Sequence, residues 1–276
     1  MIKIDLPVEL PPEIVEWQRK ANQITQQLLQ AETLEEKHQI IDRNQQHWRK
    51  PELVKWLSDL NFEKCWFTET KFGGDYQEVE HFRPKKGTKE ADGSQSANHN
   101  GYYWLAFDLA NYRLCKRRPN AKKSTFFPIC DNRFRALEPD HAWCDETPLF
   151  LDPLKQSDVL LLSFNDNGVP VPQDGIGPID IGRVKFTIEK FYLDERVLND
   201  RREQTWRTTR ALYNDYFQAS LEANSNGSIA KRTEAEQKLI QIQKLCARNA
   251  EFSSVAKESL MKLPDRMAWQ IASRVA

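Results

Sequence analysis

Glycine and proline, the two residues that interrupt helices most strongly, are distributed very unevenly along this chain. Of the 10 glycines, none precedes Gly73, nine lie between Gly73 and Gly182, and the last is Gly227. No proline occurs between Pro178 and Pro264. The pattern predicts helical segments at both ends and an irregular, strand-containing middle, which together make an α+β fold.

The N-terminal sequence predicts three helices. Apolar residues of the first recur at alternating steps of three and four, on one helix face: Ile14, Trp17, Ala21, Ile24 and Leu28. Thr33 and Glu36 form the ends of a capping box that opens a second helix. Pro51 suits the first turn of a third.

The C-terminal sequence is also typical of helices. Residues 188–221 are rich in helix formers, and a turn is predicted at 225–228. Residues 164–182 hold four glycines and three prolines, which indicates a loop or linker. We therefore predict four segments: an N-terminal helical segment (1–60), a central module (61–163), a linker (164–182) and a C-terminal helical segment (183–276).

Composition narrows the class of protein. The chain has 276 residues, and its longest aliphatic run, Val159–Leu162, is far too short to span a bilayer. The first residues lack a secretory apolar region, and the five cysteines form no CxxC pair, so we expect a cytoplasmic protein without membrane contact. The 40 basic and 40 acidic residues balance, which excludes a globally basic nucleic-acid binder but not a locally basic one.

Basic residues gather around one carboxylate–histidine pair in the middle of the chain. Glu80 and His81 are adjacent, and Pro84 ends any regular element there. Residues 111–123 contain no acid and six basic side chains: Arg113, Lys116, Arg117, Arg118, Lys122 and Lys123. Further positive charge follows His81, at Arg83, Lys85, Lys86 and Lys89. Such a patch suits a phosphate backbone; the alternative is a solvated helix face.

The same segment carries a set of oxygen donors. Glu80, Asn111 and Asn120 supply one carboxylate and two amide oxygens, which suit Mg²⁺ or Mn²⁺. A neutral His81 beside such an ion can take a proton from water at physiological pH. The alternatives are a surface histidine at position 81, a turn residue at 111 and a helix cap at 120.

The ordered set Glu80-His81, Asn111 and Asn120-Ala121-Lys122-Lys123 resembles the ββα-metal (HNH) nuclease motif. The resemblance implies that residues 61–163 hold the nuclease module. It implies that His81 and Asn111 are the catalytic residues: His81 would act as the general base, and Asn111 would brace the loop that presents it. Glu80 and Asn120 would then be the ligands of Mg²⁺ or Mn²⁺. Nucleic-acid-binding residues would be Arg83, Lys85, Arg117, Arg118, Lys122 and Lys123.

The flanking sequence resembles, more narrowly, the HNH nucleases of Septu-type and retron-associated anti-phage systems. The similar motifs lie between Cys65 and Arg202, about half of the chain, and include Tyr103–Phe107 and Leu151–Pro153. The resemblance implies an endonuclease, with DNA the favoured target, that acts in bacterial defence beside an AAA- or ABC-type ATPase partner. The alternatives are an RNA- or tRNA-cleaving toxin, and a subunit that binds nucleic acid or the ATPase without cutting.

Two further features bear on metals and partners. Many relatives carry a zinc knuckle of two CxxC pairs, but the matching positions here are Cys65, Thr68, Lys116 and Pro119, so we expect no structural zinc. Another three candidate ligands, Cys130, His141 and Cys144, are too few for a closed site. The aromatic residues of the helical flanks are either core or an ATPase docking surface: Trp17, Trp48, Trp56, Trp206, Tyr213 and Tyr216.

Overall fold

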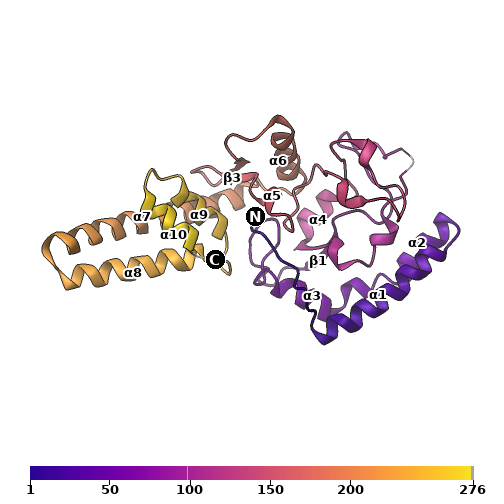
Figure 1. The fold of residues 1–276 in the computed structure, drawn as a ribbon, viewed down its shortest axis with the longest axis horizontal. Coiled ribbons are helices and arrows are strands. Elements are labelled where there is room, and N and C mark those ends of the chain that lie inside the picture. Colours follow the sequence, from indigo (N-terminus) through magenta and orange to yellow (C-terminus); the bar gives the residue numbers. More distant parts are fainter. Residues whose placement is uncertain (98, 275–276) are drawn as a thin grey trace.

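Helices build both ends of the chain in the computed structural model, which describes residues 1–97 and 99–274 (Figure 1). Residue 98, in the polar segment after His81, and residues 275–276, which end the predicted segment 183–276, lie outside the described residues. Two small antiparallel sheets lie between the helical ends. The α+β prediction is therefore confirmed.

The N-terminal helices follow the predicted pattern. They are α1 (Pro12–Gln30), α2 (Leu34–Arg43), η1 (His47–Arg49) and α3 (Pro51–Asp59). All five apolar residues of the predicted stripe on α1 are buried. The predicted capping box is present, because Thr33 Oγ1 accepts from the Glu36 amide and the Glu36 carboxylate accepts from the Thr33 amide. Trp17 and His47 then tie α1 to η1 by reciprocal bonds to each other's backbone carbonyls.

The first sheet pairs two distant segments. Strand β1 (Gln77–His81) runs antiparallel to β2 (Tyr112–Lys116), with Glu80 opposite Arg113 and His81 opposite Tyr112. Helix α4 (Arg117–Lys123) follows β2 without a break and packs on both strands. The connection between the strands contains η2 (Tyr103–Leu105) and η3 (Leu109–Asn111). Strand, strand and helix thus form one unit in the middle of the molecule (Figure 1).

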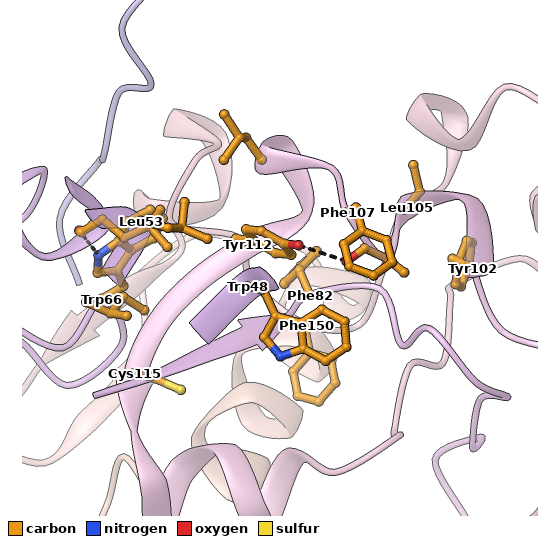
Figure 2. Close-up of a cluster of buried hydrophobic side chains, with 14 of the residues drawn as sticks. Trp48, Leu53, Trp66, Phe82, Tyr102, Leu105, Phe107, Tyr112, Cys115 and Phe150 are labelled. Carbon is orange, nitrogen blue, oxygen red and sulfur yellow. Dashed lines mark hydrogen bonds between the residues drawn. The ribbon is translucent and has the colours of Figure 1, made fainter. Parts of the chain in front are cut away.

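Aromatic side chains pack around this unit (Figure 2). Trp48 from η1 lies 5.2 Å from Phe107, measured between ring centroids, and packs edge-on against His81 at 4.8 Å. Tyr112 on β2 is fully buried, and its hydroxyl donates to the Ala106 carbonyl at 2.8 Å. Figure 2 shows Phe82 and Phe150 in the same cluster. Each large apolar side chain buried here contributes about 1.5–3 kcal/mol to stability, which fixes the strands in place.

Residues 164–182 are structured, contrary to the prediction of a loop or linker. After the short α5 (Gln156–Val159), strands β3 (Leu162–Phe164) and β4 (Pro170–Pro172) pair as a hairpin. The turn needs Gly168, whose φ is +71° and where a Cβ would lie 2.4 Å from the Asn199 carbonyl oxygen. The glycine therefore serves close packing against the following helical segment.

Residues 188–221 do not form one helix. Helix α6 (Pro178–Lys190) ends where Phe191 turns inward, and α7 (Arg196–Asn226) begins five residues later. Phe191 is fully buried and stacks on Phe67 at 3.8 Å between centroids, while Tyr192 takes a left-handed φ of +52°. Burial of one aromatic ring thus overrides the local helix propensity.

The C-terminal helices form a separate cluster. Helix α7 ends at Gly227, whose φ is +69°, and α8 (Ile229–Cys246) returns antiparallel along it, so the predicted turn is confirmed. The pair projects to the left in Figure 1, with α9 (Ser253–Met261) and α10 (Arg266–Arg274) packed at its base. Among the described residues, no helix has the length and apolar character needed to cross a membrane.

The aromatic residues of the helical flanks fill the core. Five of the six have side chains at most 9% exposed: Trp17, Trp48, Trp56, Trp206 and Tyr213. Tyr216 is half-buried and packs against Tyr213. Of the two interpretations of these residues, the structure therefore favours core packing over a docking surface.

Candidate functional site

A cavity of about 750 Å³ opens over β1 and α4. Its walls bring together Glu80 and His81 from β1, Asn120 from α4 and Lys85 from the loop after β1. Trp48 and Arg49 of η1 also line it. Residues 40 positions apart thus share one hollow because β1, β2 and α4 pack as a unit.

Glu80 lies at the buried end of the cavity. Its side chain is 8% exposed, and Lys123 Nζ lies 2.5 Å from Oε1. Burial raises the pKa of Glu80, whereas the charge of Lys123 and its hydrogen bond act in the opposite direction. Lys123 also donates to the His81 carbonyl at 3.1 Å. One ammonium group therefore already balances this buried carboxylate.

Glu78 is a second acidic group in the cavity, and our sequence reasoning missed it. Side chains two positions apart on a strand share a face, so Glu78 and Glu80 point the same way. Asn120 Nδ2 donates to Glu78 Oε2 at 2.6 Å. Arg117 Nε lies 3.9 Å from Glu78 Oε1. The two-residue spacing of Glu78 from Glu80, which puts two side chains on one face if the segment is a strand, was the available signal.

His81 is held in one tautomer. Its Nε2 lies 2.9 Å from the Ala106 carbonyl oxygen, which can only accept, so the proton is on Nε2 and Nδ1 keeps its lone pair. Lys85 Nζ lies 3.3 Å from Nδ1. Burial, and then the nearby charge of Lys85, lower the pKa of His81 well below its usual value of 6.5. The imidazole is therefore neutral at pH 7.

Lys85 is also perturbed by this environment. Burial lowers its pKa to about 8, although the charge of Glu80 opposes the shift. The ammonium lies 4.9 Å from the centre of the Trp48 ring, within range of a cation–π contact. The Lys85 ammonium therefore lies between the Trp48 ring and the unprotonated Nδ1 of His81.

Asn111 acts on the backbone rather than on the cavity. Its Oδ1 accepts from the Arg83 amide at 2.7 Å, and its Nδ2 donates to the carbonyls of Arg83 and Leu105. The side chain is 3% exposed and does not line the cavity. It clamps the loop that follows His81 to the segment that precedes β2, which is a bracing role.

The predicted nucleic-acid-binding residues divide into two groups. Arg83 is buried, and its Nε donates to Glu146 Oε2 at 2.8 Å, so it cannot reach a phosphate. Lys123 is fully buried against Glu80. Arg117 and Arg118 have side chains 75% and 63% exposed, and Lys122 and Lys85 are half-buried at the surface. Burial therefore removes Arg83 and Lys123 from the set.

Asp152 and Thr187, which both lie downstream of α4 in the sequence, support β2. Arg113 Nε and Nη2 donate to the two carboxylate oxygens of Asp152, each at 2.7 Å. Both side chains are at most 6% exposed. Thr187 Oγ1 on α6 accepts from the Leu151 amide at 2.9 Å. These contacts hold β2, and so α4 with Asn120, against α6.

The oxygen donors of the cavity are of the kinds that Mg²⁺ uses in proteins. In residues 1–97 and 99–274, no three His, Cys, Asp or Glu side chains come together to hold a metal. Asp42 also lines the cavity but pairs with Lys86, so the donor set here is the carboxylates of Glu78 and Glu80 with the amide of Asn120. Mg²⁺ is commonly held by one or two carboxylates, with water and substrate phosphate as its other ligands.

The positions that match a zinc knuckle have other roles. Cys65 is fully buried and free, and Thr68 shares a 2.8 Å hydrogen bond with Thr70. Cys130 and Cys144 are free and exposed. Trp66 and Phe67 are buried beside Cys65 and pack into the main core.

Comparison with known proteins gives one partial similarity. No model of a known protein family matches the chain. Over 123 residues the chain is 36% identical to Septu protein PtuB of Bacillus mycoides (strain KBAB4). The aligned part covers 44% of this chain and 41% of that protein, so the chain spans less than half of the relative's length.

Proposed function

We propose that the chain is a divalent-metal-dependent HNH endonuclease that hydrolyses phosphodiester bonds, with DNA the favoured target, in a Septu-type anti-phage system. The observation that carries the proposal is one cavity lined by the carboxylates of Glu78 and Glu80, the amide of Asn120 and a neutral imidazole whose Nδ1 is unprotonated and pairs only with Lys85. The partial similarity to Septu protein PtuB supports the defence setting. Cytoplasmic location belongs to the same proposal.

In this proposal Glu80 and Asn120, with Glu78 beside them, hold one Mg²⁺ or Mn²⁺. When bound, the ion offsets negative charge on the phosphate as the reaction proceeds. The hydrogen bond from Asn120 to Glu78 orients the amide so that Nδ2 faces the carboxylate and Oδ1 is left for the ion. The cavity carboxylates and the amide come from two packed elements, which keeps their spacing fixed.

His81 moves the proton. Nδ1 takes a proton from a water whose oxygen bonds to phosphorus, while the bond from phosphorus to the 3′ oxygen breaks. The Ala106 carbonyl keeps the other proton on Nε2 and stabilises the imidazolium that forms. Lys85 must first leave Nδ1, and a phosphate oxygen at the cavity offers its ammonium a stronger partner.

The exposed cations of α4 supply the grip on the nucleic acid. Arg117 and Arg118 lie in the first turn, and Lys122 lies one turn later with its ammonium 4.9 Å from the Tyr192 ring centre. The contacts that these three side chains make are at least partly exposed to solvent. Each cation can therefore exchange its present partner for a phosphate at a small free-energy cost.

The proposal is tested by incubating the purified chain with plasmid, single-stranded DNA or tRNA across a Mg²⁺ titration. Wild type should cut DNA only with the metal, and Glu80→Gln should lose cleavage. His141→Ala, an exposed histidine far from the cavity in sequence, is the control and should cut like wild type. Cutting of tRNA alone would favour the toxin alternative, and binding without cutting would favour the non-cleaving subunit.

An ATPase partner is part of the proposal and needs its own test. The chain is expressed with the ATPase encoded beside it, and the mixture is passed over a sizing column. We expect co-elution and an altered cleavage rate. A monomeric chain that cuts equally fast with and without the ATPase would refute this part alone.

A further inference from the structure

Tyr76 stands out on the surface beside the cavity. It directly precedes β1, and 78% of its surface is exposed. The other strongly exposed aromatics among the described residues, Phe134 and Trp269, are 56% and 54% exposed. An aromatic ring that is exposed to water beside a polar cavity is typical of a surface that contacts a ligand or partner.

The ring borders three adjoining hollows. It lines the 750 Å³ cavity that holds Glu78 and Glu80, and it lines a second hollow of about 370 Å³ beside the start of α4. A third, of about 520 Å³, lies between Tyr76 and α3. Tyr76 is thus the residue that the cavity shares with both neighbouring hollows, so a chain that runs from the cavity into the second hollow passes beside it.

The second hollow is basic. Lys116, Arg117, Arg118 and Arg201 line it, with Asp75 and Glu195 as its acids. Lys116 pairs with Asp75 at 2.7 Å, and Arg118 pairs with Glu195. Arg201 pairs with Glu251 at 2.6 Å, and all of these cations except Lys116 have strongly exposed side chains. Exposed pairs of this kind are weak and screened by salt, so a phosphate chain can compete for the cations.

We infer that Tyr76 stacks on an unpaired base of the polynucleotide next to the scissile phosphate, with the strand continuing into the basic hollow. The inference rests on the proposed function. An aromatic ring stacks on the face of any base and so positions a strand without reading its sequence. A base inside a duplex has both faces covered, so the ligand is a single-stranded segment of DNA or RNA.

Fluorescence anisotropy in metal-free buffer tests the inference. The probes are labelled single-stranded DNA, single-stranded RNA and duplex DNA of one sequence. Tyr76→Ala should weaken single-strand binding by about 5- to 100-fold, the usual effect of removing one base-stacking ring. Tyr76→Phe keeps the ring and should bind within about two-fold of wild type by the same argument. The strand type with the larger loss identifies the substrate.

Phe134→Ala removes an exposed aromatic outside all three hollows and is the matched control. The inference is wrong if Tyr76→Ala binds single strands like this control, or if it weakens duplex binding equally. It is also wrong if Tyr76→Phe is as impaired as Tyr76→Ala, because the hydroxyl would then be responsible. Wild type that neither binds nor cuts any probe would refute the proposed function itself.

Discussion

At the residue scale, the hydrogen bond from His81 Nε2 to the Ala106 carbonyl decides which nitrogen can act as a base. We predict that His81→Ala lowers the cleavage rate by about 10²–10⁴-fold, the usual effect of losing a general base. Nucleic-acid affinity should change little, since the cations of α4 remain. Single-turnover cleavage under saturating Mg²⁺ measures the loss, and a wild-type rate would rule out this role.

A second prediction concerns Glu78, whose carboxylate accepts a hydrogen bond from the proposed metal ligand Asn120. Glu78→Gln keeps an acceptor for the amide but removes one negative charge from the donor set. We expect half-maximal cleavage to need about 10- to 100-fold more Mg²⁺, as for other groups that support a metal ligand. Glu138→Gln, a change outside the cavity, is the control. An unchanged Mg²⁺ dependence would exclude Glu78 from the site.

At the element scale, several helices could be predicted because their signals are local. The stripe on α1, the capping box of α2 and the turn at Gly227 each depend on residues a few positions apart. The break between α6 and α7 could not be predicted, because it depends on Phe191 packing against Phe67 over a hundred residues away. The hairpin at Gly168 was missed for a similar reason.

The buried pair of Arg113 and Asp152 gives a prediction about β2. Asp152→Asn leaves the Arg113 guanidinium buried without its counter-charge, which typically costs about 3–5 kcal/mol. The free energy of unfolding in urea measures the loss. Asp59→Asn, which breaks the exposed pair with Lys55, should cost much less, because water and salt screen an exposed pair. If the two variants lost the same free energy of unfolding, the buried pair of Arg113 and Asp152 would contribute no more to stability than an exposed pair.

At the scale of the whole molecule, the candidate site was only partly predictable. Spacing along the chain was enough to select Glu80, His81 and Asn120, which the structure brings into one cavity. It was not enough to show that Arg83 and Lys123 are buried, because burial depends on distant segments such as the one carrying Glu146. A run of basic residues therefore mixes cations that face solvent with cations that balance internal acids.

Buried histidines also make stability depend on pH. Burial lowers the pKa of both His47 and His99 below 6.5, the usual value. Below pH 6.5 these histidines bind protons in the unfolded chain but not in the folded one. The free energy of unfolding therefore decreases as the pH falls. Each histidine contributes up to about 1.4 kcal/mol per pH unit in that window.

Urea unfolding at about pH 7.5 and about pH 5.5 measures this effect, because the ordinary histidine pKa of about 6.5, where the loss of stability begins, lies between them. His99 accepts from the Gly101 amide at Nδ1 and lies 3.1 Å from the Ala136 carbonyl at Nε2, so His99→Gln should be less stable but less sensitive to pH. His141→Gln, at an exposed position, should keep the wild-type slope. A slope unchanged in both variants would contradict the assignment to His99.

The clamp made by Asn111 has a practical consequence for protein engineering. Asn111 joins the two ends of the long connection between β1 and β2. Within that connection, the turn from Glu90 to Ser94 is closed by its own backbone hydrogen bonds. The side chain of Asp92 at that turn is exposed and lies outside the cavity walls. A dye or an affinity handle inserted there would be attached to a hydrogen-bonded turn outside the cavity, so the position suits a reporter group.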